Sequence, residues 1–158
     1  MTYTEQMQNI FKKYEDSGMP YPATKHQVAE WAINNGLWKP RPANIISQCA
    51  DDLAKALREE YKTDSKGRRI RTKHVVKQKK NGQMTFLWAD IDNAPRDHME
   101  MAFAQRRKQI VGDCYQLKTD VDYYNENNVS EAPIQMELDF TDDIAELQYL
   151  ENMEDDAA

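Results

Sequence analysis

The segment 66–88 constrains the fold more than any other, because it joins a dense positive charge to a strong hairpin signal. It holds eight Lys and Arg and no Asp or Glu. Asn81-Gly82 predicts a two-residue turn, since both central positions of that turn need a positive φ, which Asn and Gly adopt at low cost. The residues that suit the flanking strands are Ile70, Thr72, Val75 and Val76 before the turn and Met84, Thr85, Phe86 and Trp88 after it. The sequence therefore predicts a basic two-stranded ribbon.

Two explanations of the ribbon's charge stay open. The lysines nearest its predicted tip are Lys73, Lys77, Lys79 and Lys80. Nucleic-acid phosphate is the anion that such clusters most often bind. Alternatively, lysines on an exposed strand edge prevent pairing with other chains, although that purpose normally takes fewer charges. We favour a nucleic-acid partner.

Charge is divided unequally along the chain. Lys and Arg outnumber Asp and Glu by 20 to 13 over residues 1–112, whereas acidic residues outnumber basic ones by 14 to 1 over residues 113–158. This asymmetry favours a nucleic-acid-binding body with an acidic tail.

Neither a membrane segment nor a disulfide framework is expected. No apolar run approaches the roughly 20 residues of a membrane helix, and the first residues lack the basic and apolar regions of a signal peptide. Cys49 and Cys114 lie far apart on helical patterns. We therefore expect a reducing cytoplasm.

Three helices are predicted before the ribbon. The first spans residues 4–15, with Thr4 as its cap. The second begins at Thr24, which forms a capping box with Gln27. The third spans residues 42–61 and begins at a proline, which suits the first turn of a helix.

Three short helices and then a basic hairpin is the element order of a winged helix-turn-helix domain. Residues 4–90 resemble that superfamily in element order, spacing and wing charge. The resemblance implies binding to duplex DNA, with the third helix in the major groove and the wing on the backbone or minor groove. The predicted fold is mainly α with a small β-hairpin. It comprises a winged helix-turn-helix over residues 1–94, a long helix over residues 95–128 and an acidic tail over residues 129–158.

The expected DNA contacts lie on the third helix and on the ribbon. Arg reads guanine and Asn or Gln reads adenine by paired hydrogen bonds, and the helix offers Arg41, Asn44, Ser47 and Gln48. Asn44 and Ser47 alternatively only cap and solvate the helix. Asp51 and Asp52 follow them and would repel phosphate, which leaves most of the affinity to the ribbon. The ribbon's candidates are Lys66, Arg68, Arg69, Arg71, Lys73, Lys77, Lys79 and Lys80.

The predicted helix over residues 95–128 carries an apolar stripe with heptad spacing. Its members are Phe103, Ile110, Cys114, Leu117, Val121 and Tyr124. A helix of about 34 residues spans about 50 Å, which exceeds the width of a winged domain of about 90 residues. The sequence therefore favours a coiled coil that joins two copies, over a helix packed back on its own domain.

The acidic tail holds a candidate docking peptide. Apolar residues alternate with polar ones from Ile134 to Phe140, which is typical of a strand or of an extended peptide in another protein's groove. The segment resembles the short peptide by which bacterial replication and repair proteins bind the sliding clamp, and the resemblance rests on Gln135, Met136, Leu138 and Phe140. An added edge strand, or a tail folded back on the basic ribbon, is the alternative.

No catalytic or metal-binding pattern is recognisable in the sequence. His26, His74 and His98 are isolated, and the five glycines form no phosphate-binding loop. We expect no cofactor, no metal and no enzymatic activity. The predicted function is sequence-specific or backbone-directed binding of duplex DNA by a dimeric transcriptional regulator. The alternative is an adaptor of replication, repair or genome defence whose acidic tail docks a protein partner.

Overall fold

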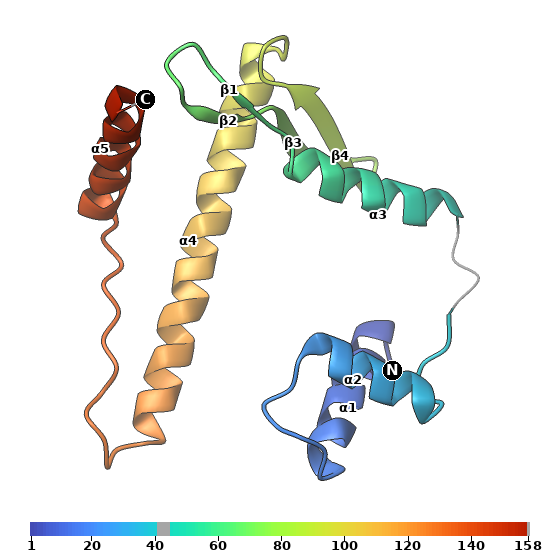
Figure 1. The fold of residues 1–158 in the computed structure, drawn as a ribbon. Coiled ribbons are helices and arrows are strands. Elements are labelled where there is room, and N and C mark those ends of the chain that lie inside the picture. Colours follow the sequence, from blue (N-terminus) through green and yellow to red (C-terminus); the bar gives the residue numbers. More distant parts are fainter. Residues whose placement is uncertain (41–44, 158) are drawn as a thin grey trace. The chain divides into compact units, whose positions relative to one another are not determined.

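The computed structural model describes residues 1–40 and 45–157 of the chain. The chain divides into two compact units, Met1–Asp51 and Asp52–Ala158. Within the described residues there are five helices and two antiparallel two-stranded sheets (Figure 1). The expectation of a mainly α fold with a β-hairpin is confirmed, and the second hairpin is an addition to it.

Helices α1 (Tyr3–Asp16) and α2 (Lys25–Asn34) form the core of the first unit. The side chains buried in it are Ile10, Tyr14, Val28 and Ala32. The ring of Tyr14 meets that of Trp31 edge-on, with 5.4 Å between the centroids. Its hydroxyl donates a hydrogen bond of 2.8 Å to the carbonyl of Pro20, which ties the connecting loop to the core.

Both helices begin with a threonine capping box. At α2 the predicted pair is confirmed, since Gln27 N donates to Thr24 Oγ1 and Thr24 N donates to the Gln27 side chain. At α1 the cap is Thr2, so the prediction of Thr4 was wrong. The reason is local: Glu5 lies three residues after Thr2 and accepts from its amide, whereas Thr4 has no acceptor at that distance.

Helix α3 (Ile45–Arg58) carries the boundary between the units. It ends earlier than predicted, because the chain turns into strand β1 at Tyr61. None of its described side chains is buried, and Ile45 and Leu53 on its apolar side are exposed. A winged helix-turn-helix domain needs its third helix packed in the core, so that arrangement is not confirmed.

The basic segment forms two hairpins rather than one. Strands β1 (Tyr61–Thr63) and β2 (Arg69–Arg71) make the first, and β3 (Lys73–Lys80) and β4 (Gln83–Asp90) make the second. The predicted turn of the second is confirmed, with φ of 51° at Asn81 and 78° at Gly82. The prediction was wrong for Ile70, which belongs to the first hairpin and pairs with Lys62.

Asp64 explains the additional hairpin. Its carboxylate accepts hydrogen bonds from the amides of Lys66 and Arg68, at 2.9 and 2.8 Å, and from Arg68 Nε at 2.7 Å. These bonds lower the pKa of Asp64 below its usual value. Gly67 supplies the positive φ of 76° that the turn needs.

Helix α4 (Arg96–Glu126) is the long helix predicted over residues 95–128, and its first half packs against β3 (Figure 1). Residues 132–140 have no regular secondary structure, and they lead into α5 (Thr141–Ala157). In the described part of the chain, no helix combines the length and the apolar character that crossing a membrane requires.

Candidate nucleic-acid interface

Strand β3 has one buried face and one cationic face, because side chains alternate along a strand. On the buried face, His74 and Val76 expose only 6% and 1% of their surface. On the other face, Lys77 and Lys79 are exposed. The buried face packs toward α4, where Ala102 is also buried. The side chains of Lys77 and Lys79 therefore leave the strand on the side opposite to His74 and Val76 and are accessible to solvent.

Helix α4 also covers part of the free edge of β3. Gln105 Oε1 accepts from the amide of Lys77 at 2.8 Å, and Gln105 Nε2 donates to the Lys77 carbonyl at 2.9 Å. A single amide side chain thus replaces the backbone of a neighbouring strand. His98 Nε2 lies 3.0 Å from the carbonyl of His74, which adds a second attachment. The two contacts fix which side chains of α4 lie beside β3.

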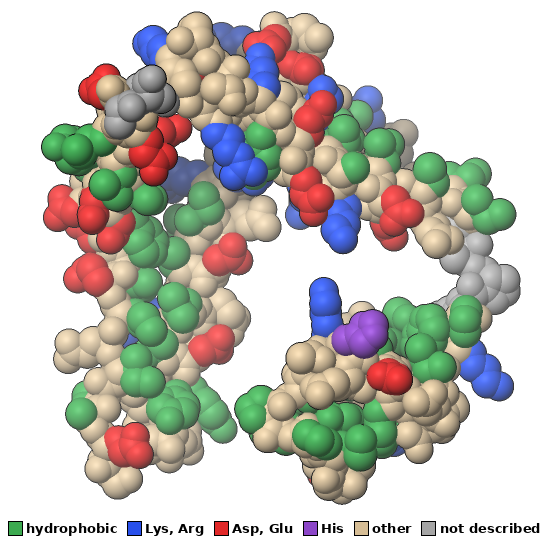
Figure 2. All heavy atoms as spheres, in the orientation of Figure 1, with side chains coloured by type: hydrophobic (Ala, Val, Ile, Leu, Met, Phe, Trp, Pro, Cys, Tyr) green, Lys and Arg blue, Asp and Glu red, His purple; other side chains and the backbone are tan. Residues whose placement is uncertain are grey.

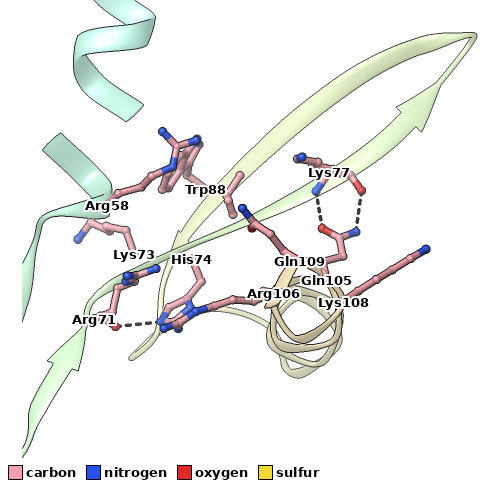
Figure 3. Close-up of a pocket in the computed structure, with 12 residues that line it drawn as sticks. Arg58, Arg71, Lys73, His74, Lys77, Trp88, Gln105, Arg106, Lys108 and Gln109 are labelled. Atoms are coloured by element: carbon pink, nitrogen blue, oxygen red, sulfur yellow. Dashed lines mark hydrogen bonds between the residues drawn. The ribbon is translucent and has the colours of Figure 1, made fainter. Parts of the chain in front are cut away.

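A cationic pocket of about 590 Å³ lies along this edge (Figure 3). Six Lys and Arg from four segments of the chain line it, namely Arg58, Arg71, Lys73, Lys77, Arg106 and Lys108. The remaining lining residues are His74, Val75, Trp88, Ala102, Gln105 and Gln109, so none of the described residues that line the pocket is acidic. A concave site with this lining attracts anions.

Arg71 of β2 lines the pocket. Its Nη2 donates to the hydroxyl of Tyr61 at 3.2 Å, while its Nε is buried without a hydrogen-bond partner among the described residues. The hydrogen bond from Arg71 and its positive charge lower the pKa of Tyr61. Partial burial, together with the charge of Arg71, lowers the pKa of Arg106. The charge of Arg71 is therefore felt at Arg106, since like charges disfavour the protonated form.

Among the described residues, Lys73 is the one lining cation with ion-pair partners. Its Nζ lies 2.9 Å from Asp90 and 3.3 Å from Glu60. Hydrogen bonds to these two carboxylates raise its pKa. Lys73 therefore ties the base of the second hairpin to the residue preceding β1, and less of its charge is left for a ligand.

Three aromatic rings lie beside cationic side chains of the pocket or of the first hairpin. Arg58 Cζ is 5.5 Å from the ring centroid of Trp88, and Lys77 Nζ is 5.8 Å from that of Phe86. Arg69 Cζ lies only 3.7 Å from the centroid of Tyr61. Such pairs are within the range of cation–π attraction. They also hold the cationic groups in position.

The residues predicted to bind DNA fall into separate groups in the structure. The pocket contains Arg71, Lys73 and Lys77. Lys79 and Lys80 are exposed near the tip of the second hairpin, and Lys66, Arg68 and Arg69 lie on the first hairpin or its turn. Ser47 and Gln48 are exposed on α3, while Arg41 and Asn44 lie outside the described residues.

The pocket also contains cations that the sequence interpretation did not assign to it. They are Arg58 at the end of α3 and Arg106 and Lys108 on α4. The signal for α4 was present as the basic run from Arg106 to Lys108. It could not be assigned, because the contact that brings it to Lys77 joins residues 28 positions apart.

The predicted dimerisation stripe is divided between two environments. Phe103 lies on the half of α4 that packs on the hairpin, and its ring meets that of His74 at 5.5 Å, but it still exposes 49% of its surface. Further along, Ile110, Leu117 and Tyr124 are exposed, as Figure 2 illustrates for hydrophobic side chains along α4. Cys114 and Val121 are partly buried. Packing on the chain's own hairpin therefore accounts for part of the surface of Phe103 and for none of the other exposed members of the stripe.

The candidate docking peptide is extended. Its start is fixed to the end of α4 by two hydrogen bonds of 2.9 Å, from Asn125 Nδ2 to the Ile134 carbonyl and from the Ile134 amide to Asn125 Oδ1. Gln135, Met136 and Phe140 are exposed, and Leu138 is partly buried. Beyond it, acidic side chains line α5, in red in Figure 2.

Within residues 1–40 and 45–157, no three His, Cys, Asp or Glu side chains are grouped so as to hold a metal ion. Comparison of the chain with protein-family models, with curated proteins and with solved structures gave no match. The winged-helix resemblance thus still rests on the sequence.

Proposed function

We propose that the protein binds nucleic acid through its phosphate backbone, with the pocket between β3 and α4 as the principal contact. The observation that supports this is the pocket lining, which has six cations and, among the described residues, no acidic one. Arg71 and Arg106 both line the pocket, and the charge of Arg71 lowers the pKa of Arg106. A phosphate oxygen is a partner that fits such a pair of guanidiniums.

The ligand is a polymer rather than a single small anion. Cations continue beyond the pocket along both hairpins, with Lys79 and Lys80 on one and Lys66 and Arg69 on the other. A phosphate chain neutralises a spread row of charges, and the release of its counterions supplies much of the affinity. The binding is therefore directed to the backbone. Reading of bases by α3 rests only on Ser47 and Gln48 among the described residues.

Duplex DNA held by a dimeric transcriptional regulator is the form that the sequence resemblance implies, and it is one of two alternatives for the ligand, the other being a single strand. The exposed part of the stripe on α4 supplies a surface for pairing two copies.

Substitution of two pocket cations tests the proposal. In Lys77→Ala/Arg106→Ala, affinity for a labelled duplex should fall about tenfold or more, since charge-assisted contacts are worth about 1.5–3 kcal/mol each before solvent screening reduces them. Fluorescence anisotropy at constant salt measures this. The control is Arg96→Ala/Lys118→Ala, which removes the same charge from α4 at exposed positions paired with Glu100 and Asp122. Equal affinities of the two variants would contradict the pocket as the contact.

A second function, docking of a protein partner by the tail, is supported by one observation. Gln135–Phe140 is extended and mostly exposed, the form in which a peptide enters another protein's groove. A bacterial sliding clamp is the partner to test. A synthetic peptide of residues 131–142 should bind the purified clamp in a calorimetric titration, and Leu138→Ala/Phe140→Ala should abolish the heat. No heat from the unaltered peptide would dismiss this partner.

A further inference from the structure

We propose that the nucleic acid bound by this protein is single-stranded, and that Phe86 and Trp88 stack against its bases. This inference rests on the proposed function, because it takes the pocket between β3 and α4 as the site of the phosphates. It adds the form of the ligand and a second set of contacts.

The residues concerned share the outer face of the second hairpin. Directly paired residues of an antiparallel hairpin lie on the same side of the sheet. Phe86 pairs with Lys77, Trp88 with Val75, and Met84 with Lys79. The opposite side holds His74 and Val76, which are buried. On the outer face, the apolar and aromatic side chains of β4 therefore lie beside Val75, Lys77 and Lys79 of β3.

This face is open at its centre. Met84 and Phe86 expose 54% and 52% of their surface, although an exposed strand position normally carries a polar residue. Trp88 is partly buried and lies beside Arg58. An aromatic side chain that remains exposed among cations is typical of surfaces that bind single strands, where bases stack on rings and cations hold the backbone.

The outer face and the pocket form one continuous surface. Val75, Lys77 and Trp88 belong to the face and also line the pocket. Lys77 contributes to both, since its Nζ is 5.8 Å from the Phe86 centroid. A strand whose phosphates enter the pocket therefore brings its bases next to Trp88 and Phe86. Those two residues lie roughly 7 Å apart along β4, which leaves room for one base at each ring.

A duplex uses this surface poorly. Its bases are stacked on one another and present only their edges in the grooves, so a protein ring reaches a base plane only after a step is unstacked. That unstacking costs a few kcal/mol for each step. In a single strand, every base has an accessible ring face. The exposed phenyl ring thus favours the single-stranded form.

Anisotropy titrations with three labelled ligands test the inference. The ligands are a 20-nucleotide DNA strand, the RNA of the same sequence, and the DNA duplex, all at one salt concentration. The wild-type protein should bind a single strand more tightly than the duplex. Phe86→Leu should weaken single-strand binding by about fivefold or more, since stacking is worth about 1–3 kcal/mol per base. It should change duplex binding less than twofold, and Phe86→Tyr should retain the affinity.

The control is Phe11→Leu, which alters an exposed phenylalanine of α1 in the first unit. Tighter binding of the duplex, or equal effects of Phe86→Leu and Phe11→Leu on single strands, would overturn the inference. If Phe86→Leu instead changes the oligomeric state in light scattering and leaves binding unaltered, the face joins copies of the chain and the inference is also wrong. Absence of binding to all three ligands would refute the proposed function itself. A preference between the two single strands shows which polymer is the ligand.

Discussion

His74 illustrates at the residue scale how the fold constrains a titratable group. The side chain is almost fully buried beside the ring of Phe103, and its Nε2 lies 2.9 Å from the carbonyl of Arg71. Burial lowers its pKa, the hydrogen bond to the Arg71 carbonyl opposes that effect, and the charges of Arg106, Arg71 and His98 add to it. The folded protein therefore binds a proton at His74 less readily than the unfolded chain does.

The resulting pH dependence can be predicted in sign. Because the pKa of His74 is lower in the folded state, stability is complete above the unfolded-state pKa of about 6.5 and falls as the pH is lowered through it. Urea titrations between pH 7.5 and 5.5 should show the free energy of unfolding decreasing toward pH 5.5. His74→Gln should flatten this dependence of stability on pH. The control variant His26→Gln should keep the slope of the wild type. Parallel slopes for the wild type and His74→Gln would contradict the burial of the neutral ring.

Short-range chemistry at single residues was predictable from the sequence. The Asn81-Gly82 turn and the Thr24 capping box depend only on residues within three positions of one another, and both are present. The cap of α1 is Thr2 and not Thr4 for an equally local reason, namely the position of Glu5 three residues after Thr2. In contrast, the unpartnered Nε of Arg71 depends on burial by distant segments, and no local pattern signals it.

At the element scale, the two halves of α4 differ in their surroundings. Its first half is held to β3 through Gln105 and His98. Beyond Gln109, the stripe residues Ile110, Leu117 and Tyr124 are exposed to solvent. Exposed apolar residues in heptad spacing are the pattern of a coiled-coil seam.

A charge in the exposed part of the stripe tests its use. Leu117→Asp should convert a dimer to a monomer in light scattering, because a carboxylate buried in a coiled-coil seam is strongly unfavourable. The control is Tyr115→Asp, which places the same charge on the opposite side of α4, at a residue that is already exposed. A wild-type protein that is monomeric at micromolar concentration would dismiss the dimer.

The helices could be predicted because their signals are periodic and local, as the bounds of α1, α2 and α4 show. The separation of the basic segment into two hairpins was missed. Its cause is the turn at Asp64, whose carboxylate accepts from the amides of Lys66 and Arg68, and this turn was not predicted from the sequence. The pocket could not be predicted from local sequence patterns, because it forms only when α4 packs beside β3 in one particular alignment.

For the whole molecule, the main electrostatic feature is the opposition between the cationic pocket and the acidic C-terminal segment. Residues 130–158 hold ten Asp and Glu and no Lys or Arg. Exposed charge pairs are individually weak, at about 0–1 kcal/mol. Tethering raises the local concentration toward the millimolar range, so we expect this segment to compete with any nucleic acid that binds the same cations.

Deletion of residues 130–158 should therefore raise the affinity for nucleic acid. The gain should be larger at low ionic strength, where charges are least screened, and should shrink as salt is added. Anisotropy titrations of the two proteins at two salt concentrations measure it. Leu138→Ala/Phe140→Ala keeps the charge of the segment and should behave like the wild type. Equal affinities of the deletion variant and the wild type at low salt would show that the segment does not compete.

The most direct test of phosphate binding is the salt dependence of the affinity of the unaltered protein for a labelled 20-nucleotide strand. Binding through the pocket and the hairpins predicts a straight line of log affinity against log salt concentration. With four or more phosphates contacted, its slope should be about −3 or steeper. A slope near zero between 50 and 300 mM KCl, or no binding at about 50 mM, would contradict the account, because phosphate contacts always release counterions.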